Sequence, residues 1–107
     1  MDDQPRFRTF VEQPEYTAQF DAIAAKYSMD LLTRLLAGAM NGIATNPRAY
    51  DCVLWDIRMA KTRSLGLEVP VFRIFFQIQN EGKEDEHVLL CWIEEISAID
   101  ELTDYVM

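Results

Sequence analysis

The chain has 107 residues, half of them apolar, with only four glycines and four prolines, which excludes a fibrous or disordered protein and leaves room for one domain. Its formal net charge of -8 by itself disfavours a nucleic-acid partner. The charge is uneven, because residues 80–107 carry nine acidic side chains against one lysine, whereas residues 1–79 are balanced. We therefore expect a single domain spanning residues 1–107, with a locally basic middle and an acidic end.

Neither a targeting signal nor a metal site is expected from the sequence. Met1 to Gln4 is acidic and no apolar stretch follows, so a signal peptide is not predicted. The longest apolar run, Leu31 to Met40, is interrupted by Arg34 and is too short to cross a bilayer, which favours a cytoplasmic protein. Cys52 and Cys91 have apolar neighbours and are interpreted as reduced core thiols. With a single histidine and two distant cysteines, we expect no metal and no cofactor.

The first half of the chain predicts one strand and two helices. Phe7 to Val11 is rich in aromatic and β-branched residues and favours a short strand that ends before Pro14. Pro14 suits the first turn of a helix that continues to Tyr27. The apolar residues that trace one face of this helix are Tyr16, Phe20, Ile23, Ala24 and Tyr27.

A second helix follows after a short break, so the two are predicted to form an antiparallel hairpin. Ser28 or Asp30 can cap its N-terminus, and Gly42 and Pro47 are expected to end it. Its apolar positions repeat the helical spacing at Leu32, Leu35, Leu36, Ala39 and Ile43.

In the second half the apolar period changes to two, which indicates strands. Thr62 to Leu67 and Val69 to Ile78 are predicted to pair as a hairpin, and a loop over Asn80 to Glu86 leads to His87 to Ile93. This last strand is apolar on both faces and is therefore expected to be central. Ser97, with Asp100 three residues later, predicts a short terminal helix.

Alternation along Val71 to Ile78 separates a core face from an open face of the sheet. Phe72, Ile74, Phe76 and Ile78 point to the core, whereas Arg73 points to the opposite face beside Phe75. If the two segments form a hairpin, Arg63 and Arg73 would converge and could hold a phosphate. The alternative is that both are surface arginines, solvated or paired with carboxylates. Trp55 and Trp92 are interpreted as core or interface anchors.

The predicted fold class is α+β: an N-terminal strand, an antiparallel two-helix hairpin, a three-stranded antiparallel sheet and a short C-terminal helix. This order resembles the RelE/ParE superfamily of small bacterial toxins from type II toxin-antitoxin systems, over nearly the whole chain. The segments that carry the resemblance are Asn46-Pro47-Arg48, Thr62-Arg63-Ser64-Leu65, the aromatic-Arg-aliphatic run Phe72 to Ile78, and the apolar run Val88 to Ile93.

The resemblance implies an activity for the basic residues. RelE-type members cleave messenger RNA in the ribosome without a metal, by driving a ribose 2′-hydroxyl onto the adjacent phosphate. On that model Arg73 would clamp the phosphate, assisted by Arg63 and Lys61 as further catalytic residues. The match stops after the last strand, where RelE-type nucleases carry basic residues and this chain has Glu94 and Glu95. Those carboxylates would repel RNA.

Two other functions are left open by this departure. ParE-type members poison DNA gyrase by protein contact and share the strand arginine, and an acidic end is less of an obstacle for them. The third alternative is a non-toxic protein-binding module, in which Arg63 and Arg73 are structural and pair with Glu94 or Glu95. In each toxin reading the expected partner is a cognate antitoxin laid over the helices and sheet. Homodimerisation stays open.

Overall fold

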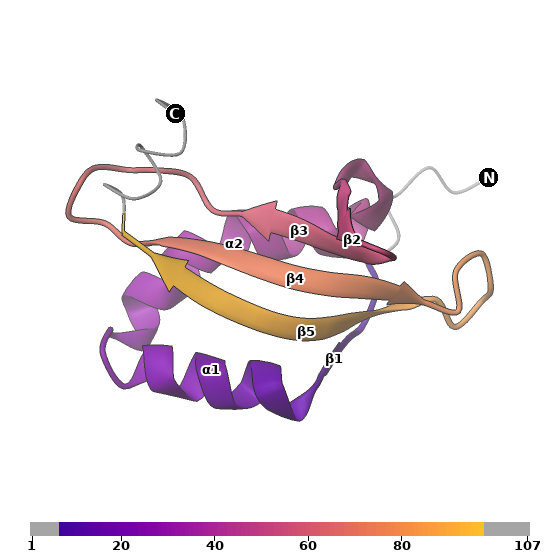
Figure 1. Ribbon diagram of the computed structural model, residues 1–107, viewed down its shortest axis with the longest axis horizontal. Coiled ribbons are helices and arrows are strands. Elements are labelled where there is room, and N and C mark those ends of the chain that lie inside the picture. Colours follow the sequence, from indigo (N-terminus) through magenta and orange to yellow (C-terminus); the bar gives the residue numbers. More distant parts are fainter. Residues whose placement is uncertain (1–6, 98–107) are drawn as a thin grey trace.

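The computed structural model describes residues 7–97 and consists of two helices packed against a five-stranded sheet (Figure 1). The strand order is β1-β5-β4-β3-β2, with β1 parallel to β5 and all other neighbours antiparallel. Helix α2 crosses behind the sheet, and α1 runs along β5. The elements are β1 (Phe10–Glu12), α1 (Pro14–Ala24), α2 (Met29–Thr45), the 3-10 turn η1 (Pro47–Ala49), β2 (Cys52–Leu54), β3 (Ile57–Lys61), β4 (Val71–Gln79) and β5 (His87–Ile96).

The prediction of a three-stranded antiparallel sheet is wrong, because the α+β chain builds a five-stranded mixed sheet. The N-terminal strand joins it in parallel with β5, and β2 was not foreseen. The strand expected over Thr62 to Leu67 ends earlier, at Lys61. Thr62 continues the contact with β4, because its N–H donates to the Phe72 carbonyl at 3.0 Å and its hydroxyl accepts from the Phe72 N–H at 2.9 Å. The turn between β2 and β3 contains Trp55 and Asp56 and no glycine, so the sequence shows no hairpin signal there.

The helical hairpin forms as predicted, and its second helix ends two residues before Pro47, one of the two residues expected to end it. The Ser28 hydroxyl accepts a hydrogen bond from the Leu31 N–H at 3.1 Å, which confirms Ser28 as the N-cap. Helix α2 continues through Gly42 and ends at Thr45. The predicted terminal helix beginning near Ser97 lies outside the described residues.

The core lies between the helices and the face of the sheet formed by Phe72, Ile74 and Phe76, all fully buried as predicted. Tyr27 packs edge-on against Phe72, and Tyr50 against Phe76. Burial of each large side chain contributes about 1.5–3 kcal/mol. Because the core occupies this face of β4, the opposite face, which carries Arg73, is the one that can contact a partner.

Helix α1 also closes the edge of β5 that the short strand β1 leaves open. The Gln13 N–H donates to the Leu90 carbonyl at 3.0 Å, where the chain passes from β1 into α1. Three residues later along β5, the Gln19 side chain accepts a hydrogen bond from the Ile93 N–H at 2.8 Å. An edge that is paired in this way is protected from another strand.

At the end of the sheet beside the β4–β5 loop, a buried carboxylate joins four parts of the chain. The Glu86 side chain is 3% exposed and lies 2.7 Å from Arg8 Nε, and it also pairs with Arg48. Arg8 in turn donates to the Thr45 carbonyl at the end of α2, at 2.6 Å. Hydrogen bonds from Arg48, then from the Gly82 N–H, lower the pKa of Glu86 to about 2. Glu86 is thus an ionised structural centre.

Cys91 is buried as expected, whereas the expectation of a core position is wrong for Cys52, which is exposed on the edge strand β2. Both cysteines are free thiols. Among the helices of residues 7–97, none combines the length and apolar character needed to cross a membrane.

Candidate functional site

Three described cations lie together at the other end of the sheet, around an open groove of about 470 Å³ between α2 and the end of β3. We call Arg34, Lys61 and Arg63, which line it, the basic groove. Arg34 projects from α2 and pairs with Asp30 one turn earlier, at 2.8 Å. Lys61 is the last residue of β3, and Arg63 follows in the connection to β4. Within residues 7–97 no hydrogen bond or ion pair to Arg63 is found.

Tyr50 forms part of the groove wall and is held from three directions. Its carbonyl accepts a hydrogen bond from Arg58 at 2.6 Å, and its ring lies edge-on to Phe76 with centroids 5.7 Å apart. Its hydroxyl lies where a Cβ at Gly42 would be, so α2 needs glycine at that position. The groove therefore has one rigid wall, supplied by the core.

Arg73 lies on the open face of the sheet and outside the basic groove. The register places Lys61, Arg73 and Glu94 side by side on β3, β4 and β5. Arg73 Nη1 is 3.1 Å from Glu94 Oε1, which is one of the pairings that a structural role predicts. Lys61 lies between the two arginines that the sequence analysis selected. It lines the groove with Arg63 and is the register neighbour of Arg73 on β4.

Glu94 and Glu95 point to opposite faces, as the strand period requires. On the helix side, Glu95 accepts a hydrogen bond from the Tyr27 hydroxyl and lies 2.6 Å from Lys26 Nζ. Burial alone would raise the pKa of Glu95, but the bonds from Lys26 and Tyr27 outweigh it and hold that pKa below its usual range. Glu95 is therefore committed to the helical hairpin, and only Glu94 faces Arg73.

Sequence reasoning missed Arg34 as a member of the basic groove. The available signal was its position: it interrupts the apolar run Leu31 to Met40, on a helix predicted to pack on the sheet.

The groove offers cations and the Tyr50 hydroxyl, but no histidine. His87, the single histidine, lies at the opposite end of β5 with its Nδ1 2.9 Å from the Asp85 carbonyl. This arrangement is suited to holding an anion, because the described residues that line it include three cations and no carboxylate.

The turn between β2 and β3 presents a second candidate surface, the hairpin tip, which we define as Val53, Leu54 and Trp55. All three are exposed, and Trp55 is 86% exposed. Trp55 also has a φ of 51°, a left-handed conformation that is unfavourable for a bulky residue. A large aromatic side chain is thus held in solvent at some cost in backbone energy.

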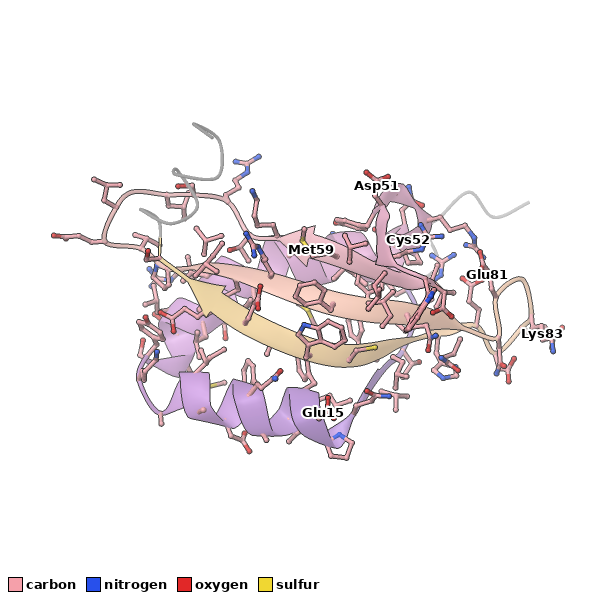
Figure 2. The ribbon with its side chains drawn as sticks, viewed as in Figure 1. Glu15, Asp51, Cys52, Met59, Glu81 and Lys83 are labelled. Carbon is pink, nitrogen blue, oxygen red and sulfur yellow. The ribbon has the colours of Figure 1, made fainter. Side chains whose placement is uncertain are left out.

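The open face of the sheet continues from this hairpin. Met59 on β3 projects from it (Figure 2), and on the neighbouring strands Phe75 stacks on Trp92 with ring centroids 4.6 Å apart. The aromatic pair is half-buried. Its polar border at one end is the Lys61, Arg73 and Glu94 row.

Comparison of the chain with models of protein families, with curated proteins and with solved structures gives no match. Residues 7–97 contain no group of three or more side chains that could hold a metal ion. The interpretation of the two surfaces therefore rests on their own chemistry.

Proposed function

We propose that this protein is the toxin-like component of a bacterial type II toxin-antitoxin pair, acting in the cytoplasm by contact with a protein target. DNA gyrase, the target of the ParE branch, is the target to test first. The observation that carries the contact mode of action is the hairpin tip, where Trp55 is 86% exposed in a left-handed conformation.

Tryptophan is among the residues that contribute most to protein interfaces, because a large rigid ring is desolvated on binding. Backbone strain of this type is concentrated at functional sites. The neighbouring Val53 and Leu54 extend the apolar surface along an edge strand. A protein partner would bury all three, whereas RNA cleavage gives them no role.

The state of Arg73 also favours contact over cleavage. Its guanidinium lies 3.1 Å from the Glu94 carboxylate, so a phosphate would have to compete with a negative charge already in place. Arg73 then contributes to the shape and charge of the open face, which suits a protein surface. The same face, with the Phe75 and Trp92 stack, is where a neutralising antitoxin would bind.

Induced expression in bacteria tests this proposal. We expect growth arrest accompanied by DNA-damage signalling, with protein synthesis continuing at first. Trp55→Ala should restore growth, because it removes the contact without touching the core. Leu67→Ala, which truncates another exposed apolar side chain, in the β3–β4 connection, is the matched control and should remain toxic. Normal growth with abundant folded wild-type protein, or full toxicity of folded Trp55→Ala, would contradict the proposal.

A second candidate function, metal-independent cleavage of ribosome-bound mRNA, is favoured by the basic groove alone. Arg34, Lys61 and Arg63 could together neutralise a phosphate backbone. On this alternative, induction should stop translation within minutes and produce shortened transcripts. Arg63→Ala combined with Arg34→Ala should abolish both effects. The separate Trp55→Ala variant should remain toxic. The two functions therefore predict opposite outcomes for the same pair of variants.

A further inference from the structure

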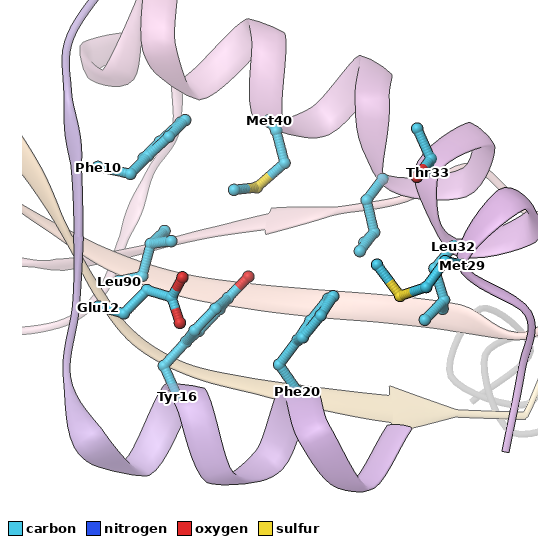
Figure 3. Close-up of a pocket in the computed structure, with 10 residues that line it drawn as sticks. Phe10, Glu12, Tyr16, Phe20, Met29, Leu32, Thr33, Met40 and Leu90 are labelled. Atoms are coloured by element: carbon cyan, nitrogen blue, oxygen red, sulfur yellow. The ribbon is translucent and has the colours of Figure 1, made fainter. Parts of the chain in front are cut away.

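An apolar pocket of about 260 Å³ lies between α1, α2 and β1, on the side of the molecule away from the open face (Figure 3). It is slightly smaller than the 300–1,000 Å³ that is usual for drug-sized ligands. Two aromatic rings and a methionine project into it from three elements, Phe10 from β1, Phe20 from α1 and Met40 from α2. Met29, 57% exposed, also lines it. A compact apolar body of about ten non-hydrogen atoms would fill such a space.

Two polar groups meet beside these walls. Tyr16 is 3% exposed as a residue and lines the pocket together with Glu12. Its hydroxyl places a polar group in a mostly apolar lining. Burial, and then the charge of Glu12, raises the pKa of Tyr16 to about 12. The hydroxyl therefore stays neutral and can accept as well as donate.

Glu12 lies beside the Tyr16 ring (Figure 3). One carboxylate oxygen, Oε1, accepts a hydrogen bond from the Thr17 hydroxyl at 2.8 Å, and Oε2 has no bond to any residue from 7 to 97. Glu12 is also the single charged side chain among the described residues that line the pocket. The pocket thus combines an apolar interior with one negative charge at its polar end, which attracts a cation and repels an anion.

We propose that this pocket binds a small primary amine whose body is an aromatic ring or a branched aliphatic group. The ammonium donates to Glu12 Oε2 and to the Tyr16 hydroxyl oxygen, and the body packs among Phe10, Phe20 and Met40. A carboxylic acid of the same size meets the Glu12 charge and is rejected. This site is separate from both surfaces of the proposed function and does not depend on it.

Titration with 2-phenylethylamine tests the site on the full chain carrying ¹³C-methyl methionine. The Met29 and Met40 methyl signals should shift in a saturable manner with a Kd of about 0.1–1 mM, the range that nine non-hydrogen atoms can supply. Met59, on the open face, is an internal control whose signal should not move. Phenylacetate has the same ring with the opposite charge and should bind at least about tenfold more weakly.

Substitutions separate the polar contacts from the apolar cavity. Glu12→Gln should weaken amine binding about tenfold, because it removes the negative charge and keeps the side-chain shape. Tyr16→Phe should weaken binding about fivefold, because it removes the hydroxyl acceptor. Glu15, next to Tyr16 in the first turn of α1, does not line the pocket, and Glu15→Gln should leave the Kd within about twofold. Unchanged Met29 and Met40 signals at about 10 mM amine, equal binding of phenylacetate, or unchanged affinity in folded Glu12→Gln would each overturn the proposal.

Discussion

At one end of the sheet, Arg8 and Arg48 converge on the buried carboxylate of Glu86, whereas at the other end Arg34, Lys61 and Arg63 line an open groove. Both ends collect several cations close together. The two ends differ in whether the fold supplies an anion. The Glu86 end has a buried carboxylate from the β4–β5 loop, whereas the groove end has no buried carboxylate among the described residues. The comparison teaches that an arginine cluster is structural or available for binding according to what it is packed against.

The largest effect is expected from removing the charge at the closed end. Glu86→Gln leaves Arg8 and Arg48 without their anion in a buried position, and it should lower the free energy of unfolding by about 3 kcal/mol. Urea unfolding measures this. Glu81→Gln, which removes the exposed partner of Arg48, is the matched control and should change stability by less than about 0.5 kcal/mol. A similar loss in both variants would show that Glu86 is not distinct from a surface charge.

The same carboxylate predicts the pH dependence of stability. Its pKa is about 2 in the folded protein against 4.5 for the unperturbed group, so the folded state binds the proton less readily than the unfolded state. The stabilisation from Glu86 is therefore complete above about pH 4.5 and is lost as the pH falls towards 2. Unfolding measured between pH 6 and pH 2 should show the gap between wild type and Glu86→Gln closing. A constant gap would be inconsistent with ionic pairing.

The rigid wall of the basic groove is tested by two glycines of α2. Gly42→Ala places a methyl group against the Tyr50 hydroxyl and should destabilise the protein by about 1–2 kcal/mol. Gly38→Ala meets no atom within 4 Å and should stabilise it by up to about 1 kcal/mol, because alanine is the better helix former. Thermal unfolding of the two variants, which differ by one helical turn, gives the comparison directly. Equal effects would mean that Tyr50 does not press on α2.

The smallest effects on stability are expected from the predicted catalytic arginines. Arg73→Ala removes a partly exposed ion pair with Glu94 and should cost less than about 1 kcal/mol, and Arg63→Ala should change stability by less than about 0.5 kcal/mol. Chemical unfolding in low and high salt is the measurement, and only the Arg73 difference should shrink with salt. A large loss of stability in Arg63→Ala would mean that Arg63 contributes to holding the fold together.

Much of the helical half could be predicted from the sequence, because the signals there are local. The cap at Ser28 and the apolar spacing of α1 and α2 depend on residues a few positions apart. Pro47 follows the end of α2 as predicted, whereas Gly42 lies inside the helix, where the side chain of Tyr50 leaves no room for a Cβ. That restriction arises from tertiary packing, which periodicity does not record.

The sheet was harder, because its register depends on turns and on distant partners. A left-handed Trp55 makes the β2–β3 turn without the glycine or asparagine that normally indicates one, so β3 was placed several residues too late. The parallel pairing of β1 with β5 joins residues nearly eighty positions apart.

The candidate site shows the same limit. Arg63, Lys61 and Arg73 could be selected as basic residues near strand ends. The sequence offered the pairing of Arg73 with Glu94 only as one alternative among several, and it did not predict that Arg34 joins the groove. Glu86 was one of several acidic residues in a predicted loop, and nothing in its local sequence distinguishes it from Glu84. Its burial depends on Arg8 and Arg48, far away along the chain.

The two tryptophans occupy contrasting environments, Trp55 in solvent and Trp92 stacked on Phe75 within the sheet. Their intrinsic fluorescence should therefore separate into a quencher-accessible component from the hairpin tip and a shielded one from the sheet. A spectroscopist could follow docking of a partner through the first and loss of the fold through the second, in one unlabelled sample.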